Sequence, residues 1–265
     1  MPRTRTLTSQ HRETFKHQGV LRLEGLLDAQ AVRRAREAVL WPFEHAGLWR
    51  DGAWRLDAAP PGRWPKVGNR RPEVESLVRA PALLAAVEGL LNGHPIDWTL
   101  HKRPQILVTP PDTDRWTLPT GWHPDSPRLA SGESLGVQLF ALLDTVEPRG
   151  GGTLAVAGSH RLVDEGRFLR AADIAARLRR EAFFKGLYAG EPSDGEGGGL
   201  PKGAVGDVPL EVIELTGAPG DVYLMDLRLL HSAAPNASTR PRMMITHRFA
   251  RADLTVELAE GYDWP

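Results

Sequence analysis

Residues 121–128, GWHPDSPR, place a histidine and an aspartate two positions apart with a proline between them. A residue that precedes proline favours extended backbone, and side chains at positions i and i+2 of an extended segment point to the same side. His123 and Asp125 are therefore expected to present an imidazole and a carboxylate together. The pair alone is a weak signal, because a turn with an exposed histidine and a capping aspartate has the same pattern.

A second stretch, GDVYLMDLRLLHSAAPNASTRPR at residues 220–242, carries His231 at the end of an apolar run. Two histidines and one carboxylate that leave other coordination positions open suit non-haem Fe(II) oxygen chemistry. Arg242 follows a polar turn and opens the next apolar run. Its planar guanidinium can hold the far carboxylate of a 2-oxo acid through two parallel hydrogen bonds, which a lysine cannot do with the same geometry.

Four blocks of this chain resemble the phytanoyl-CoA dioxygenase (PhyH) family of Fe(II)/2-oxoglutarate oxygenases. They are FKHQGVLRLEGLLDAQAVRRAREAV, GWHPDS, RGGGTLAVAGSHR and GDVYLMDLRLLHSAAPNASTRPR, and they follow one another in the family's order. The resemblance implies a mainly β fold with flanking helices and a double-stranded β-helix core (jelly-roll, cupin-like). It also implies that iron is bound by His123, Asp125 and His231, that Arg242 binds the 2-oxoglutarate carboxylate and that Gln105 contacts 2-oxoglutarate.

The same resemblance implies the reaction and its cofactors: Fe(II), 2-oxoglutarate as co-substrate and O2. Hydroxylation of an unactivated C–H bond of a small molecule, with release of succinate and CO2, is the expected activity. Asp125 argues against halogenation, because halogenating relatives have a small residue there, whereas desaturation, ring closure and epoxidation stay open. Many relatives carry a hydroxyl residue where this chain has Ala233. The carboxylate clamp therefore either lacks a usual partner or uses Ser232, Thr246 or another residue in its place.

Other polar residues near these motifs have simpler interpretations. His160, in the glycine-rich block, is expected to be structural. His247 has the opposite strand parity to Arg242 and is expected to face away from the metal, whereas Arg248 has the same parity. Arg248 is therefore either a substrate contact or a rival to Arg242. Trp122 is expected either to line the pocket or to pack in the core.

Helical patterns dominate the first part of the chain, about residues 1–94. Asp28 is predicted to cap a helix over AQAVRRAREAVLWPF, and Pro42 is expected to end it. A second helix is predicted over residues 81–93. Residues 50–72 are rich in Pro, Gly, Trp and Arg and are predicted to form an irregular loop that helps to close the pocket.

From about residue 95 the pattern changes to short apolar or β-branched runs bounded by Gly, Pro, Asp and Asn. Such runs after a helical part predict an antiparallel β core buttressed by helices. GAPGD at 217–221 is predicted to be a tight turn. Residues 162–209, with a helix-like piece and a glycine-rich segment, are predicted to form a lid-like insertion. Residues 1–265 are predicted to form a single domain.

Composition excludes several classes of protein and site. The 33 Lys+Arg and 33 Asp+Glu residues balance, which argues against binding to a nucleic-acid backbone. The chain has no cysteine, so a metal must be held by His, Asp or Glu. It has neither a signal-peptide pattern nor an apolar run of about 18 residues, which predicts a cytoplasmic protein without a membrane segment.

One alternative from another class stays open: a non-oxygenase metal-binding jelly-roll protein, either an isomerase or a ligand-binding module. Such a protein could keep both histidines and the aspartate, but it would have no need of Arg242 at this position. The partner expected in either case is a small-molecule substrate or ligand. The Trp and Arg content of residues 50–72 hints at a planar or anionic molecule.

Overall fold

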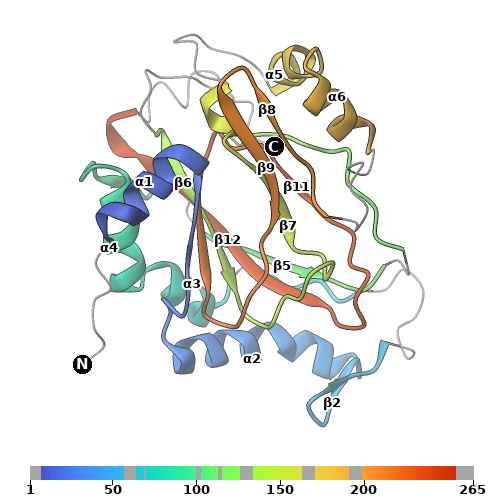
Figure 1. Ribbon diagram of the computed structural model, residues 1–265. Helices are drawn as coiled ribbons and strands as arrows, with labels where there is room; N and C mark the ends of the chain where they lie inside the picture. The colour runs from blue at the N-terminus through green and yellow to red at the C-terminus, as the bar shows by residue number, and fades with distance from the viewer. Residues whose placement is uncertain are drawn as a thin grey trace.

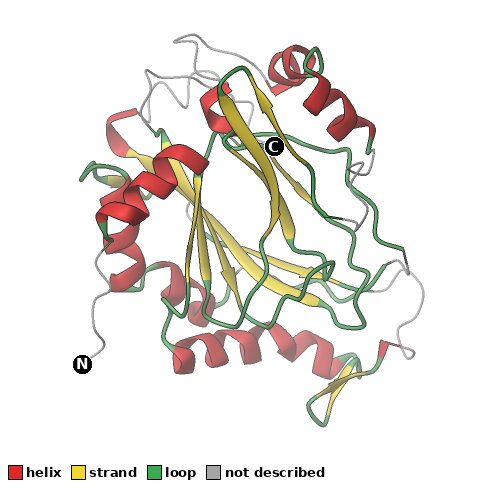
Figure 2. Cartoon of the chain, viewed as in Figure 1, coloured by secondary structure: helices red, strands yellow, loops and turns green. Residues whose placement is uncertain are grey.

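Two antiparallel sheets face each other, and helices cover their outer sides (Figures 1 and 2). The computed structural model describes residues 7–56, 64–68, 70–99, 103–112, 115–125, 134–162, 171–190 and 199–254. In the larger sheet the order is β1 (Val20–Leu23), β10 (Val222–Asp226), β6 (Gly136–Leu142), β12 (Arg242–Arg251) and β4 (Ile96–Asp97), with β5 (Gln105–Thr109) also paired to β12. The smaller sheet has the order β11 (His231–Ala233), β7 (Thr153–Ala157), β9 (Val208–Glu214) and β8 (Lys202–Val205).

This arrangement is the jelly-roll core with flanking helices that the sequence predicted. The helices of the N-terminal part are α1 (Ser9–Gln18), α2 (Ala29–His45), α3 (Pro72–Val78) and α4 (Pro81–Leu90). Two further helices, α5 (Ala171–Leu178) and α6 (Ala182–Ala189), lie beside the smaller sheet. Within the described residues, none of the helices has the length and apolar character that crossing a membrane requires.

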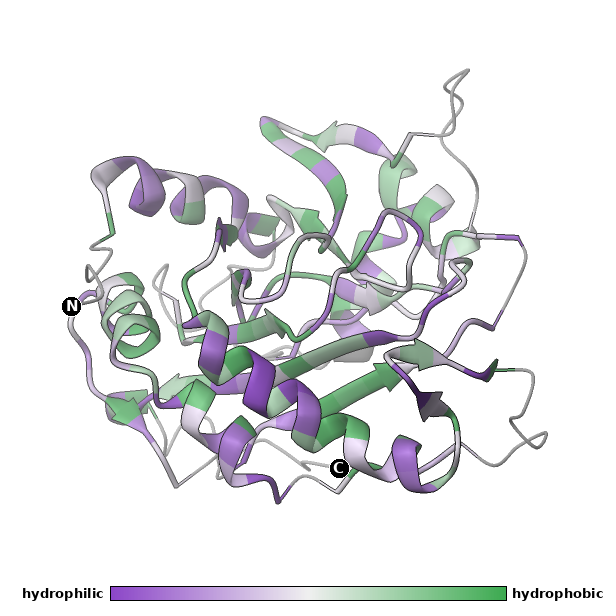
Figure 3. Cartoon of the chain, turned by 90° about the horizontal axis from the view of Figure 1, so that it is seen from below, coloured by the Kyte–Doolittle hydropathy of each residue, from purple (hydrophilic) through white to green (hydrophobic). Residues whose placement is uncertain are grey.

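Strand β6 shows how the core is divided. All of its residues are buried, and alternate side chains join different hydrophobic clusters. Val137 and Leu139 pack with the side chains of α2, α3 and α4, whereas Phe140 and Leu142 face the interior between the sheets. Each such fully buried side chain contributes roughly 1.5–3 kcal/mol. Figure 3 shows the same division, with mainly green strands inside and purple segments on the outer helices.

Helix α2 begins where the sequence predicted and ends later. The Asp28 side chain accepts a hydrogen bond from the Ala31 backbone N–H at 2.9 Å, which confirms the predicted N-cap. Pro42 does not end the helix, which continues to His45. A proline keeps a helical φ, and its missing N–H removes one hydrogen bond near the end of the helix. Continuation buries Phe43 completely, which offsets that loss.

Two segments contain more regular structure than the sequence predicted, and a third forms a strand where its pattern indicated extended backbone. The expected loop at 50–72 contains most of a small hairpin, β2 (Trp49–Arg50) with β3 (Ala53–Trp54), and the start of α3. The N-terminal part, predicted to be mainly helical with an extended segment at residues 20–27, supplies β1 within that segment, and β1 pairs with β10 in the larger sheet. The insertion expected at 162–209 contains α5 and α6, but its last residues form β8 and the beginning of β9. Residues 191–198, the glycine-rich part of that insertion, lie outside the described residues.

The turn predicted at 217–221 is confirmed. It joins β9 to β10, and the Asp221 backbone N–H donates to the Ala218 carbonyl at 3.1 Å. Gly220 has a φ of 92°, a backbone conformation that favours glycine. The turn leads into β10 and then to His231, so it helps to bring the second predicted motif into the interior.

Candidate functional site

His123 and His231 lie on neighbouring backbone segments. The His123 N–H donates to the His231 carbonyl at 3.1 Å, and the His231 N–H donates to the His123 carbonyl at 3.0 Å. The Asp125 N–H donates to the Leu227 carbonyl at 3.0 Å. These three backbone hydrogen bonds fix the first motif against the loop that precedes β11, so the three predicted ligand residues come together.

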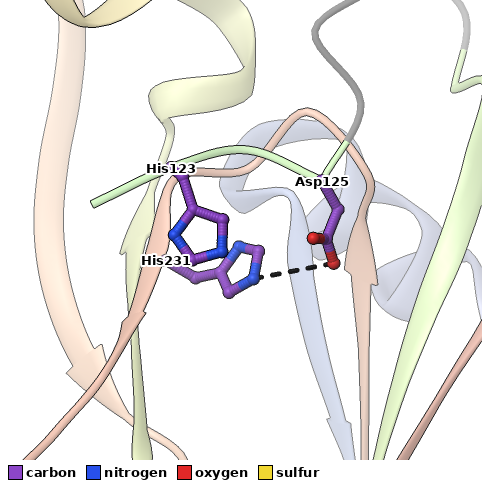
Figure 4. Close-up of side chains that lie close together, drawn as sticks. All are labelled: His123, Asp125 and His231. Atoms are coloured by element: carbon purple, nitrogen blue, oxygen red, sulfur yellow. Dashed lines mark ion pairs between the residues drawn. The ribbon is translucent and has the colours of Figure 1, made fainter. Parts of the chain in front are cut away.

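Figure 4 shows the three side chains converging on one point. Nδ1 of His123 lies 2.9 Å from the Gly121 carbonyl, and Nδ1 of His231 lies 3.0 Å from the Leu229 carbonyl. A carbonyl accepts, so each Nδ1 carries the proton and each Nε2 keeps its lone pair for a ligand role. Nε2 of His231 is 3.6 Å from Oδ2 of Asp125, and one ligand atom from each residue lies within 4.8 Å of the others.

The electrostatics of this cluster favour a neutral imidazole beside a charged carboxylate. Burial lowers the pKa of His231, and the carboxylate of Asp125 only partly opposes this effect. Burial raises the pKa of Asp125, but His231 and Arg248 together outweigh burial and hold that pKa below its ordinary value. A neutral imidazole and an ionised carboxylate are the forms that bind a metal ion.

Arg248 lies at this cluster. The sequence suggested either a substrate contact or a rival to Arg242, and neither interpretation anticipated this position. Nη2 of Arg248 donates to Oδ1 of Asp125 at 2.7 Å. The strand parity that associates it with Arg242 was correct, since both side chains leave β12 on the interior face. The contact with Asp125 could not be read from parity, because it depends on the backbone hydrogen bonds that hold residues 123–125 beside His231 and Leu227.

Arg242 lies further along the same face of β12 and is buried, with 5% of its surface exposed. Its Nη2 donates to Oγ1 of Thr109 at 2.6 Å, and its Nη1 lies 3.5 Å from Oγ1 of Thr153. Its Nε has no hydrogen-bond partner within the described part of the chain. Burial lowers the pKa of Arg242 to about 10, and Glu214 offsets only part of that effect. A buried guanidinium held by neutral hydroxyls is suited to an anionic ligand.

The hydroxyl that relatives place at the Ala233 position is supplied from a neighbouring strand. Thr153 of β7 lies directly opposite Ala233 of β11 in the sheet register, and residues in this relation share a face. Neither substitute named from the sequence is a hydrogen-bond partner of Arg242. Ser232 pairs with Leu154, whose side chain packs on the other face of the smaller sheet, and Thr246 accepts a hydrogen bond from Gln138 at 3.0 Å.

Gln105 occupies the far end of β5 from Arg242. In the β5–β12 register it lies opposite Thr246, whereas Thr109 lies opposite Arg242. Four strand residues span roughly 13 Å, so the guanidinium of Arg242 is beyond its reach. Gln105 instead lines a small pocket at the end of the strand, together with Arg103, Thr246, His247 and Arg248. The predicted contact between Gln105 and 2-oxoglutarate therefore stays a prediction.

His160, His247 and Trp122 have structural surroundings. His160 is buried, and its Nε2 lies 3.0 Å from the Lys16 carbonyl of α1, as expected for a structural residue. His247 packs on the outer side of the sheet against Trp98 and Phe249, with ring centroids 6.1 and 4.7 Å away. It therefore faces away from the cluster, as predicted. Trp122 is buried among apolar side chains of the smaller sheet and α6.

A family model described as phytanoyl-CoA dioxygenase (PhyH) matches residues 15–244. The chain therefore belongs to the phytanoyl-CoA dioxygenase family, which confirms the resemblance seen in the four sequence blocks. The family consists of Fe(II)/2-oxoglutarate oxygenases, so the fold and the residue cluster described above fall in that enzyme class. No curated protein sequence matches the chain.

Solved structures share the fold over almost the whole chain. AviO1 from Streptomyces viridochromogenes Tue57 superimposes with a TM-score of 0.58 at 22% identity, covering 93% of this chain and 97% of AviO1. SnoK, an alpha-ketoglutarate-dependent carbocyclase from nogalamycin biosynthesis, gives 0.59 at 20% identity, with 94% and 86% covered. HygX from Streptomyces hygroscopicus, with nickel and 2-oxoglutarate bound, gives 0.56 at 18% identity, with 93% and 88% covered. At these identities the likeness establishes the fold.

Proposed function

We propose that this protein is an Fe(II)- and 2-oxoglutarate-dependent dioxygenase that hydroxylates a small-molecule substrate. One observation carries the proposal: the convergence of two imidazole Nε2 atoms and one carboxylate oxygen in the same interior as a buried arginine held by hydroxyls. Family membership gives the enzyme class, and these residues supply what the class requires. An isomerase or ligand-binding module with the same fold would account for the metal ligands but not for Arg242.

His123, Asp125 and His231 fit iron. Two imidazoles and one carboxylate form a set of three ligands, which leaves positions for a two-atom chelating co-substrate and for oxygen. The Nδ1 contacts to backbone carbonyls orient both rings before any metal binds. When bound, the iron supplies oxygen activation coupled to conversion of 2-oxoglutarate into succinate and CO2.

Arg242, Thr109 and Thr153 fit the far carboxylate of 2-oxoglutarate. The guanidinium is a permanent cation in a buried place, and its hydrogen bonds to the two threonine hydroxyls fix the plane of its fork. A carboxylate bound there would remove the cost of leaving a buried cation without an anionic partner. The role of these residues is to bind and orient the co-substrate.

Hydroxylation is the outcome that we propose, and ring closure is the main competitor because SnoK is a carbocyclase. Asp125 occupies the ligand position that a halogenating enzyme would leave to a halide, which supports hydroxylation over halogenation. The substrate would reach the cluster from the side of His123, the one exposed member of the triad.

An anaerobic titration with Fe(II) and 2-oxoglutarate tests the proposal, with the weak visible charge-transfer band as the readout. The band is expected in the wild type and is lost in His231→Ala. Arg242→Ala keeps the band but needs a higher 2-oxoglutarate concentration, and Arg240→Ala serves as the control because its side chain is half exposed and pairs with Asp144. A folded, metal-loaded wild type without the band would overturn the cofactor assignment and favour the isomerase or binding module. Succinate release then screens substrates.

A further inference from the structure

The two carboxylate oxygens of Asp125 have different neighbours. Oδ2 lies 3.6 Å from Nε2 of His231, on the side where the three ligand atoms converge. Oδ1 accepts a hydrogen bond from Nη2 of Arg248 at 2.7 Å. The Asp125 side chain is only 6% exposed, so this short contact is not an ordinary surface ion pair. Each oxygen of the carboxylate therefore has its own neighbour.

Strand β12 places Arg248 for this contact. Side chains alternate along the strand, and Arg248 leaves it on the interior face, which it shares with Thr246 and Arg242. Its register partner on β6 is Gln138, which is buried and donates to Thr246. Arg248 is 24% exposed, so its guanidinium reaches Asp125 from the rim of the interior. The arginine thus belongs to a strand of the core and not to a loop.

We propose that Arg248 is a positioning residue that reserves Oδ1 of Asp125 and leaves Oδ2 as the single oxygen available to the metal. This inference rests on the proposed function. A carboxylate with both oxygens free can take two coordination positions, and those positions are needed by co-substrate and oxygen. The guanidinium also offsets the carboxylate's charge from outside the ligand set. Partners of this kind, one shell beyond the metal, orient the ligands and tune the metal's affinity.

Arg248 could instead serve as a substrate contact, as its strand parity allows. The structure favours the positioning role, because the guanidinium already donates to Asp125 through the group that points into the interior. A substrate contact would change the substrate's KM and leave the substrate-free metal site as it was. The two roles therefore differ in a measurement that requires no substrate.

The test measures metal binding in Arg248→Met, Arg248→Gln and Arg248→Lys, with Arg240→Gln as the matched control. Arg240 is an arginine near the start of the same strand whose partner is Asp144, away from the cluster. Anaerobic titrations give the Fe(II) dissociation constant without 2-oxoglutarate, and the Co(II) absorption spectrum reports the coordination number. Melting curves of the metal-free proteins show that each variant is folded, and Arg248→Lys, the mildest change, provides a folded variant.

Arg248→Met and Arg248→Gln are expected to change the Fe(II) dissociation constant by about 10- to 100-fold, the usual size of the effect of losing such a partner. Both are expected to shift the Co(II) spectrum, because the carboxylate can then offer both oxygens. Arg248→Lys keeps the positive charge but lacks the planar guanidinium. Its Fe(II) dissociation constant and Co(II) spectrum are therefore expected to lie between those of the wild type and those of the other two variants. Equal dissociation constants and identical spectra, with or without a raised substrate KM, would overturn the proposal. If His231→Ala binds Fe(II) as tightly as the wild type does, the proposed function is overturned instead.

Discussion

Thr153 lies directly opposite Ala233 in the sheet, and its hydroxyl is 3.5 Å from Nη1 of Arg242. A hydroxyl that relatives carry on one strand is thus carried here by the neighbouring strand. The hydroxyl of Thr109 is 2.6 Å from Nη2 of Arg242, so Thr109 and Thr153 together give the arginine two hydroxyl partners. Thr153 is therefore the residue that we propose in place of a hydroxyl at position 233.

Removing these hydroxyls should weaken 2-oxoglutarate binding. Thr109→Val is expected to raise the 2-oxoglutarate dissociation constant about tenfold, since hydrogen bonds to charged groups contribute about 1.5–3 kcal/mol. Thr153→Val, with its longer contact, is expected to have a smaller effect, and adding Ala233→Ser to it should restore part of the affinity. Anaerobic titration of metal-loaded protein measures each constant. The exposed Thr239→Val is the control, and an effect of similar size there would contradict the assignment.

Metal binding should stabilise the folded protein. A metal at 100 times its dissociation constant adds about 2.7 kcal/mol to the free energy of unfolding when it binds only the folded state. Thermal unfolding with and without Mn(II) is expected to show this gain in the wild type and in His17→Ala, whose histidine is exposed on α1. His231→Ala is expected to show no gain. Equal stabilisation of that variant would place the metal somewhere else.

His247 should make stability depend on pH. Burial lowers its pKa to about 4, whereas an unfolded histidine has a pKa near 6.5. Between these values the unfolded chain binds a proton that the folded protein does not, so the free energy of unfolding falls as the pH is lowered through this window. The contribution is up to about 3 kcal/mol. Denaturant unfolding of wild type and His247→Phe from pH 7 to pH 4 measures it, and an equally steep decline in the variant would refute the prediction.

Gly158 should tolerate no side chain. It has a φ of 89°, and a Cβ there would lie 2.3 Å from the backbone oxygen of Pro209. Gly158→Ala is expected to destabilise the protein by about 2 kcal/mol or more, from backbone strain and this clash. Gly206→Ala is the matched control, since Gly206 also has a positive φ, 58°, but its Cβ would meet open space. Denaturant midpoints that are equal in the two variants would contradict the steric argument.

The sequence predicted those parts of the site that depend on local backbone geometry. The spacing of His123 and Asp125 indicated two side chains on one side, and the structure brings them to one point. Strand parity correctly separated Arg248 from His247. The N-cap at Asp28 was equally local, because it needs only the backbone that follows it.

The features that the sequence did not reveal depend on contacts between distant segments. Thr109 and Thr153 reach Arg242 only through the register of β5 and β12 and the packing of the two sheets. The partnership of Arg248 with Asp125 depends on the backbone hydrogen bonds that hold residues 123–125 beside His231 and Leu227. Pro42 was misjudged for the same reason, since burial of Phe43 outweighs a local helix-ending preference.

The reciprocal backbone hydrogen bonds between His123 and His231 fix the distance between the two imidazoles through the main chain. Those residues are separated by about two fifths of the sequence. Because His231 follows His123 in the chain, the two imidazoles can meet only after residue 231 has been synthesised, so a metal ion that needs both rings would bind only to a chain that is nearly complete.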